Sequence, residues 1–295
     1  MPYRPRSTLE QWRILQAVVD AGGYAQAAEL LNKSQSSLNH AVSKLQSQLG
    51  VELLEVIGRK AQLTDAGEVM LRRSRVLTQQ IEDLELLADN IEQGWEPEIR
   101  IAVELAYPKH FLYRALQTFY PLSRGSRVQI IDTVLTGTSE IIVQKKADLV
   151  IAGVVPKGYL SEPLYVSRFI AVVGAGHELA NQLRLDQNQL SQYLQIVIRD
   201  TAQKPLENIG WLKAEQRWTV DNFNEAIEIL QLGLGFCWLP DFTVASALAK
   251  GDLVQIQLSN SSERLAPMSL LTPQEETLGP GSKQLRQLIL AEHLK

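Results

Sequence analysis

The stretch YAQAAELLNKSQSSLNHAVSKLQSQL, residues 24–49, decides the fold of the N-terminal part of this chain. Its second half repeats apolar residues at the three- and four-residue steps of one helical face, at Leu38, Val42, Leu45 and Leu49. Ser34 is suited to cap that helix, because a serine hydroxyl accepts a hydrogen bond from a free amide of the first turn. We therefore expect a buried-face helix that begins near Gln35.

The opposite face of this helix is polar and contains no carboxylate. In a helix-turn-helix the N-terminal part of the second helix enters the major groove, where glutamine or asparagine can pair with adenine and lysine can reach guanine. The residues predicted to contact DNA on this helix are Ser34, Gln35, Ser36, Asn39, His40 and Lys44, with Gln35, Ser36, Asn39 and His40 as base readers. The alternative is an ordinary helical hairpin with a solvated polar face.

The residues before this helix complete a three-helix core. Small side chains at Ala25, Ala27 and Ala28 would let the preceding helix cross closely, and Gly22 and Gly23 separate it from a first helix. That first helix would follow Ser7 or Thr8 as its cap. It is expected to bury Leu9, Trp12, Leu15, Val18 and Val19.

After Gly50, the stretch VELLEVIGRKAQLTDAGE alternates short apolar segments around Gly58-Arg59-Lys60, as a small two-stranded wing would. With these pieces in place, residues 8–75 resemble the winged helix-turn-helix of the LysR-type transcriptional regulators. The matching motifs are AGGYAQAAELLNKSQSSLNHAVSKLQSQLG and LTDAGE. The resemblance implies binding to double-stranded DNA, with a phosphate contact from the wing at Arg59 or Lys60.

Two positions depart from the family pattern. The family usually has a Leu-Phe pair followed closely by arginine at the start of the wing, whereas this chain has LLEVIG at residues 53–58 before Arg59. The family also tends to place an acidic residue after the leucine near the end of the recognition helix, where this chain has Gln46.

Residues 66–93 read as one long helix with a seven-residue repeat of apolar positions. The positions predicted to form a dimer seam are Met70, Leu77, Ile81, Leu84, Ala88 and Ile91. A helix of this length reaches on the order of 40 Å at 1.5 Å per residue, too long to be buried in one small domain. We expect a homodimer or homotetramer, as the resemblance also implies; the alternative is a solitary helix packed on its own chain.

Beyond Pro97 the chain alternates apolar strand-like runs with helical patterns, which is typical of a parallel α/β sheet. The strand candidates are IRIAVEL, VQIIDTV, ADLVIAGVV, RFIAVVG, QIVIRD, GFCWLP and MSLLTP. The helices are expected at about residues 108–120, 138–146, 185–194, 222–232 and 242–250. This region resembles the two-lobed effector domain of the same family, similar to periplasmic binding proteins, through KADLVIAG, LGLGFCWLP and GDLVQIQL.

The expected fold class is α/β overall, with an N-terminal winged helix-turn-helix (helical with a small β wing), a linker helix and a two-lobed α/β effector domain. The expected boundaries are 1–65 for the DNA-binding domain, 66–94 for the linker and dimerisation helix and 95–295 for the effector domain. Within the last, lobe one is expected at about 98–163 plus 268–295, and lobe two at about 164–267.

Ligands of open α/β sheets bind at the carboxyl ends of strands, where loops and helix N-termini offer free amides. The effector-binding residues that this rule selects are Ala106, Tyr107 and Pro108 after the first strand, Thr133, Thr136, Gly137 and Thr138 after the second, Gly153 after the third, Arg199 and Thr201 after QIVIRD, and Phe236 and Pro240 in the GLGFCWLP turn. Free amides and Arg199 favour an anionic ligand. The family often has serine or threonine where this chain has Ala106 or Tyr107, which favours an aromatic one.

Composition limits the remaining function classes. The chain has 295 residues, 45% of them hydrophobic, and a formal net charge of −4, which argues against a protein that coats nucleic acid nonspecifically. Residues 1–75 nevertheless contain ten Lys and Arg against seven Asp and Glu. No apolar run approaches the roughly 20 residues that span a bilayer, so we expect a cytoplasmic protein without membrane contact. The single cysteine, Cys237, cannot form an intrachain disulfide and is expected in the core.

An enzyme and an architectural DNA protein are the competing hypotheses. The four histidines form no short-spaced metal pair, and neither a GxSxG motif nor a phosphate-cradling loop is present, so we predict no catalytic residues, metal or cofactor. A ligand-independent DNA protein would not need a second region of some 200 residues. The sequence therefore favours a regulator first, then a constitutive repressor, then an enzyme. The resemblance adds RNA polymerase as an expected partner.

Overall fold

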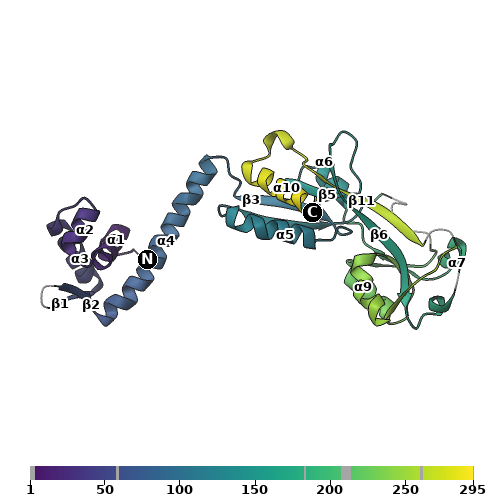
Figure 1. Cartoon of the computed structure of the whole chain (residues 1–295), viewed down its shortest axis with the longest axis horizontal. Coiled ribbons are helices and arrows are strands. Elements are labelled where there is room, and N and C mark those ends of the chain that lie inside the picture. The colour runs from purple at the N-terminus through teal and green to yellow at the C-terminus, as the bar shows by residue number, and fades with distance from the viewer. Residues whose placement is uncertain (1–3, 58–59, 183, 207–213, 260–261, 295) are drawn as a thin grey trace. The chain divides into compact units, whose positions relative to one another are not determined.

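The computed structural model describes residues 4–57, 60–182, 184–206, 214–259 and 262–294. The chain divides into two compact units, Met1–Asn90 and Ile91–Lys295 (Figure 1). The boundary lies inside one long helix, α4 (Asp65–Glu92), which covers most of the segment predicted as a linker helix. Each unit has its own hydrophobic core.

Three helices build the core of the N-terminal unit: α1 (Leu9–Asp20), α2 (Tyr24–Leu30) and α3 (Gln35–Leu49). α1 begins with a capping box, in which the Thr8 hydroxyl accepts from the amide of Gln11 while the Gln11 side chain accepts from the amide of Thr8. The predicted cap of α3 is confirmed, because Ser34 Oγ accepts from the Ser37 amide at 3.2 Å. Asn32 forms the intervening turn in the left-handed region, which asparagine tolerates better than most residues.

The buried face of α1 differs from the prediction in its first turn. Leu9 was expected inside but is 37% exposed, whereas Ile14, Leu15 and Val18 face the core. Gln11 takes the inward position of that first turn, and its side-chain Nε2 donates a hydrogen bond to Gln48 Oε1 at 2.9 Å. A hydrogen-bonded polar residue therefore replaces an apolar one where α1 meets the end of α3.

A two-stranded wing follows α3 and leads into α4. Strands β1 (Leu54–Ile57) and β2 (Lys60–Leu63) pair antiparallel, with Leu54 opposite Leu63. The first turn of α4 lies directly against the chain before β1, since a Cβ built on Gly67 would lie 2.0 Å from the carbonyl oxygen of Leu53. Glycine is required there because the backbones approach too closely for any side chain.

The C-terminal unit is built on a mixed sheet. Within the described residues its order is β4-β3-β5-β11-β6-β9-β7-β8, with β10 paired to β6. The strands are β3 (Glu98–Glu104), β4 (Arg127–Thr133), β5 (Leu149–Ala152), β6 (Glu162–Gly174), β7 (Gln195–Ile198), β8 (Arg217–Val220), β9 (Phe236–Pro240), β10 (Leu253–Gln255) and β11 (Glu263–Leu271). β6 and β11 run antiparallel to each other and connect two lobes (Figure 1).

Lobe one contains the parallel strands β4, β3 and β5, and lobe two contains β7, β8, β9 and β10. The helices of lobe one are α5 (His110–Phe119), α6 (Thr136–Val143) and α10 (Pro280–Glu292), and those of lobe two are α7 (Gln187–Ser191), α8 (Phe223–Gln231) and α9 (Asp241–Lys250). Short 3-10 turns add η1 (Tyr120–Leu122), η2 (Glu178–Asn181) and η3 (Glu275–Thr277). α5 and α10 pack side by side on lobe one (Figure 1).

The predicted α/β class is confirmed, but the sheet is mixed rather than parallel. β11 runs antiparallel to both β5 and β6, because it returns the chain from lobe two to lobe one. β6 and β11 are longer than the runs RFIAVVG and MSLLTP suggested, since their outer halves alternate exposed and half-buried residues and lack a continuous apolar signal. β8, β10 and α10 were not among the elements predicted from the sequence.

We predict that Gly67→Ala destabilises the N-terminal unit by about 1–3 kcal/mol, because the new methyl group forces the first turn of α4 away from Leu53. Hydrogen exchange of peptides from residues 24–49 in the full chain measures this as faster exchange. Gly176→Ala is the matched control, because nothing lies within 4 Å of its Cβ position. Unchanged exchange in Gly67→Ala would contradict the close approach.

Candidate nucleic-acid interface and ligand cavity

The polar face of α3 is exposed along its length. Leu38, Val42 and Leu45 are buried against α1 and α2, which turns the opposite face outward. The predicted DNA-contacting residues on it are all exposed: Ser34, Gln35, Ser36, Asn39, His40 and Lys44. With no acidic residue in the helix and the positive end of its dipole at Ser34, this face can approach phosphates without repulsion.

Gln46 connects α3 to the wing, a role that sequence reasoning did not find. Its Oε1 accepts hydrogen bonds from the backbone amides of Leu53 and Leu54, at 2.7 and 2.9 Å. These amides belong to the segment that enters β1, so the interaction sets where the wing begins relative to α3. A neutral amide oxygen accepts these bonds without adding negative charge to α3.

The wing tip carries the predicted phosphate contact. Arg59 lies outside the described residues, and so does the side chain of Lys60, whose backbone begins β2. Their role in binding phosphate remains a prediction.

The predicted dimer seam on α4 divides into a packed part and an exposed part. Met70 packs against the core of the N-terminal unit, and Ser74 is buried with its Oγ accepting from Gln16 Nε2 at 3.0 Å. From Leu77 onward the seam faces outward, with Leu77 53% and Leu84 61% exposed. Ile81, Ala88 and Ile91 are exposed as well. Met70 is therefore used within the chain, because the first turns of α4 cover α1.

A cavity of about 300 Å³ lies between the two lobes of the C-terminal unit. Its lining residues are Glu104, Leu105, Ala106, Val134, Leu135, Gly153 and Val154 from lobe one, Gln195, Ile196, Val197, Ile198, Phe223, Cys237 and Trp238 from lobe two, and Phe169, Ala266 and Met268 from β6 and β11. A mostly apolar site with few polar groups is typical of small-molecule binding. Of the predicted effector residues, Ala106 and Gly153 line it.

Glu104, at the end of β3, is the one charged side chain among the lining residues that the structure describes. Only 6% of it is exposed. Its Oε1 accepts from the Leu135 amide at 3.1 Å, and its Oε2 accepts from the Thr138 hydroxyl. Burial raises the pKa of this carboxyl group to about 7, although the bonds from Thr138 and Leu135 act in the opposite direction, and nearby Asp200 raises it further.

Leu135, which Glu104 holds, has a strained backbone. It stands between β4 and α6 with φ 52° and ψ −117°, a region that residues with a Cβ rarely adopt. Leu135 lines the cavity, and its backbone amide donates a hydrogen bond to Glu104. The turn is thus kept in this conformation by a carboxyl group that also faces the cavity.

The N-terminus of α6 is bound by lobe two. Asp200, which follows β7, accepts hydrogen bonds from the amides of Thr136 at 3.1 Å and Gly137 at 3.0 Å. Next to it, Thr201 Oγ1 accepts from the Val134 amide at 2.9 Å. A Cβ on Gly137 would lie 2.0 Å from Thr201 Oγ1, so glycine permits this approach of the lobes. Sequence reasoning selected Thr136, Gly137 and Thr201 but missed Asp200.

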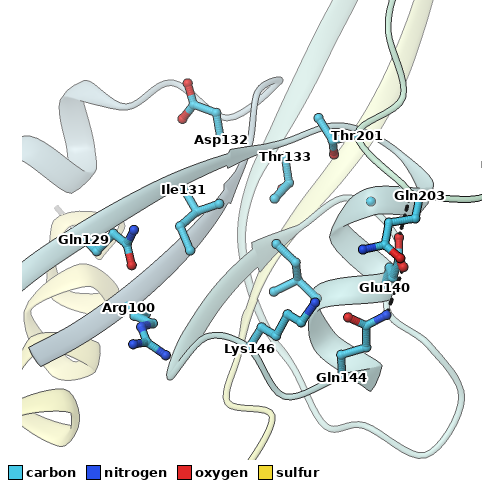
Figure 2. A pocket seen from close by; sticks show the side chains of 12 residues that line it. Arg100, Gln129, Ile131, Asp132, Thr133, Glu140, Gln144, Lys146, Thr201 and Gln203 are labelled. Carbon is cyan, nitrogen blue, oxygen red and sulfur yellow. Dashed lines mark hydrogen bonds between the residues drawn. The ribbon is translucent and has the colours of Figure 1, made fainter.

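A second hollow, of about 540 Å³, lies beside β4 and α6 (Figure 2). Three predicted residues line it, Thr133, Gly137 and Thr201. Figure 2 shows Glu140 between Gln203 and Gln144: its carboxylate accepts from the Gln203 amide and from Gln144 Nε2, each at 2.9 Å. Most of its lining residues are polar and exposed to solvent.

The remaining predicted effector residues lie elsewhere. Tyr107 is buried in lobe one, where its hydroxyl bonds to His293 Nε2 at 2.7 Å, and Pro108 is buried just before α5. Thr138 is buried and bonds to Glu104 and to Thr133. Phe236 and Pro240 are buried at the two ends of β9. None of these residues is among those that line the interlobe cavity.

Arg199, expected to attract an anion, points away from the cavity. It is exposed and pairs with Asp221, with 2.9 Å between Arg199 Nε and Asp221 Oδ1. Adjacent side chains of an extended segment point to opposite sides, so Asp200 faces α6 when Arg199 faces solvent. The signal for Glu104 and Asp200 in the sequence was a carboxylate at the end of an apolar strand.

Neither a metal site nor a membrane segment is found in the part of the chain that the structure describes. No group of three His, Cys, Asp or Glu is placed to hold an ion there, and no helix there has the length and apolar character to cross a bilayer. Cys237 is buried, as predicted, and burial raises the pKa of its thiol. A neutral thiol is a poor nucleophile.

We predict that Glu104→Gln stabilises the C-terminal unit above pH 7. Because the folded carboxyl has a pKa of about 7 against 4.5 in its ordinary state, the wild type loses stability as pH rises from about 4.5 through 7. Glutamine cannot ionise, so the variant avoids this loss, which reaches at most about 3 kcal/mol. Urea unfolding at pH 5 and pH 8 measures the difference. An equal pH dependence in both proteins would contradict the burial of an ionisable Glu104.

Two family models match this chain. The LysR substrate binding domain matches residues 92–293, and the bacterial regulatory helix-turn-helix protein of the lysR family matches residues 9–68. A curated relative, the uncharacterized HTH-type transcriptional regulator YeeY of Escherichia coli (strain K12), is 29% identical and covers 96% of this chain and 93% of its own. The probable regulator YhaJ of the same strain is 28% identical, covering 87% and 88%.

Two solved structures share the fold. The LysR-type transcriptional regulator CrgA from Neisseria meningitidis has a TM-score of 0.51 at 18% identity, covering 97% of this chain and 98% of its own. LysG from Corynebacterium glutamicum, solved with bound effector Arg, has a TM-score of 0.51 at 16% identity, with the same coverage of 97% and 98%.

Proposed function

This chain belongs to the LysR family of bacterial transcriptional regulators, and on that premise we propose that it binds specific promoter sequences as a homo-oligomer under control of a small molecule held between its lobes. Members of the family regulate transcription and are not enzymes. The observation that carries the proposal is the outward face of α3, polar and free of carboxylates, on a helix whose other face is fully buried.

The DNA-binding mode follows from which side chains α3 presents. Gln35 and Asn39 are exposed near its N-terminal end, where an amide side chain can pair with an adenine edge. Lys44 is exposed farther along, where a cation suits the phosphate backbone. Base reading is thus assigned to the start of α3, and backbone contact to Lys44 together with Arg59 or Lys60 of the wing.

We predict that Gln35→Ala weakens binding to the operator by about 1–3 kcal/mol and relaxes its base preference, because one bidentate base contact is lost. The operator is first obtained by selecting genomic fragments on the purified protein. Affinities for it and for a scrambled duplex are then measured by fluorescence anisotropy at several salt concentrations.

Lys44→Ala is the matched comparison for this measurement. It should weaken operator and scrambled duplex alike and lower the salt slope by about one, since it removes a phosphate contact. Equal losses on both duplexes for Gln35→Ala would remove Gln35 from the base readers.

Oligomerisation is assigned to the exposed part of the α4 seam. Leu77, Ile81, Leu84, Ala88 and Ile91 recur at heptad spacing and are open to a partner helix. A symmetric dimer would place two α3 helices on half-sites spaced by about one helical turn of DNA or a multiple of it. A tetramer would extend the same arrangement to further half-sites.

We predict that Leu84→Glu shifts the protein toward monomers and lowers operator affinity at least tenfold, because a buried charge opposes pairing of the two helices. Leu86→Glu is the matched control: Leu86 is 59% exposed, close to the 61% of Leu84, but it faces the other side of α4. Sedimentation velocity measures the oligomeric state. Identical behaviour of the two variants would reject the seam.

Effector control and contact with RNA polymerase complete the proposal. A ligand between lobes can shift a regulator only if it binds one arrangement of the lobes more tightly than the other. The interlobe cavity supplies a site for such a ligand. The contact of Asp200 with α6 supplies an arrangement of the lobes that the ligand would alter. LysG, which shares the fold, was solved with an effector, which supports ligand control in this chain. Polymerase contact is proposed as the output of the DNA-bound form.

A further inference from the structure

The described residues that line the interlobe cavity are mostly apolar and include no cation. Leu105 and Val134 line one side, and Ile196, Phe223 and Trp238 line the other. No lysine, arginine or histidine is among the lining residues that the structure describes. An anion placed here would lose its hydration without gaining an opposite charge, which opposes its binding.

The nearby cation does not change this. Arg264 lies over the Trp238 ring, with its guanidinium carbon 4.0 Å from the ring centroid, and it is not among the described residues that line the cavity. Its guanidinium is engaged in a cation–π contact with this aromatic wall.

A ligand carboxylate can bind to the free amides at a helix N-terminus. In this chain the amides at the start of α6 already bind the carboxylate of Asp200. Both carboxylate oxygens of Asp200 accept from α6, Oδ2 from the Thr136 amide and Oδ1 from the Gly137 amide. Asp200 Oδ1 also accepts from the Ala202 amide at 2.9 Å, which fixes the orientation of the carboxylate. An anionic ligand would have to displace Asp200, which belongs to lobe two and accepts hydrogen bonds from lobe one.

Glu104 and Gln195 are the polar side chains among the described lining residues, and Glu104 is the one that can be charged. Each of its oxygens has a second lone pair beyond the bond from Leu135 or Thr138, so the carboxyl group can accept a donor from a molecule in the cavity. An N–H or O–H group would satisfy it, and a protonated amine would satisfy it best, because charge-assisted hydrogen bonds are the stronger ones.

The same residue links the cavity to the contact between the lobes. Glu104 holds the amide of Leu135, and the next two residues, Thr136 and Gly137, donate to Asp200 of lobe two. A ligand that changes how Glu104 bonds therefore acts on the turn that joins the lobes. This is the kind of differential contact that effector control requires.

We propose that the effector of this regulator is a small apolar compound without negative charge, neutral or cationic, that donates a hydrogen bond to Glu104, while Asp200 occupies the place of a ligand carboxylate. The proposal rests on the proposed function, in that the interlobe cavity is taken as the effector site. It replaces the anionic ligand that Arg199 suggested, and it retains the aromatic one, for which Phe169, Phe223 and Trp238 provide the walls.

The test uses the full-length protein and compounds that share a ring and differ in one head group. The probes are 2-phenylethylamine, 2-phenylethanol and phenylacetate, together with tryptamine, tryptophol and indole-3-acetate, each titrated at pH 7.5 by ligand-observed NMR. Two variants fill the cavity, Ala266→Phe and Gly153→Leu, and identify binding that occurs there. Circular dichroism checks that each variant folds, and the second variant gives a result if the first does not fold.

The expected result is that the amines and alcohols bind at least tenfold more tightly than the carboxylates and that both cavity-filling variants abolish this binding. Carboxylates that bind the wild type as tightly as the amines overturn the inference and leave the proposed effector site in place. If neither cavity-filling variant weakens the binding of any probe, both the inference and the effector site are rejected.

Two substitutions test the assigned roles directly. Glu104→Gln should weaken the amines about tenfold and the alcohols less, because the charge is lost while an acceptor oxygen remains. Asp200→Ala should tighten the carboxylates at least threefold, since it frees the amides of Thr136 and Gly137. Asp221→Ala is the matched control, because it removes one negative charge from lobe two at the exposed pair with Arg199. Equal effects of the two aspartate variants would overturn the role of Asp200.

Discussion

The free amides at the N-terminus of α6 are the constraint on which the C-terminal unit depends. A helix leaves its first amides without partners, and burying them unsatisfied is costly. Here two carboxyl groups meet this requirement: Glu104 holds the preceding Leu135 amide from within lobe one, and Asp200 holds Thr136 and Gly137 from lobe two. These bonds hold the strained turn at Leu135 beside the cavity and join the two lobes that β6 and β11 connect.

In the N-terminal unit, too, a side chain accepts hydrogen bonds from backbone amides, but here the bonds connect a helix to the wing. Gln46 accepts from the two amides that lead into the wing, so α3 and the wing form one surface. Gly67 lets α4 start directly against Leu53, which ties the long helix to the same surface. Because these connections use a neutral amide and a glycine, no carboxylate is added to the face of α3.

Local patterns predicted the elements that local physics controls. The apolar steps of α3 and the cap at Ser34 lie within one helix and its first turn, and both were correct. The same reasoning failed where partners come from far along the chain. β8, β10 and the outer halves of β6 and β11 are strands because of what they pair with, and none of them contains an apolar run long enough to predict a strand. Met70, which was assigned to the dimer seam, also packs against the N-terminal core, a contact that its own segment does not reveal.

The sequence by itself determined the family, the α/β class and the helix proposed to face DNA, because periodicity, caps and motif spacing are properties of short segments. Only the tertiary structure decided which residues meet between the lobes. Ala106 and Gly153 reach the cavity, whereas Tyr107 bonds to His293 and Arg199 turns to solvent beside Asp221. The order of the strands decides which strand ends lie next to each other. Because side chains alternate along an extended chain, moving by one residue reverses the direction in which the side chain points. For that reason Asp200, and not its neighbour, joins the two lobes.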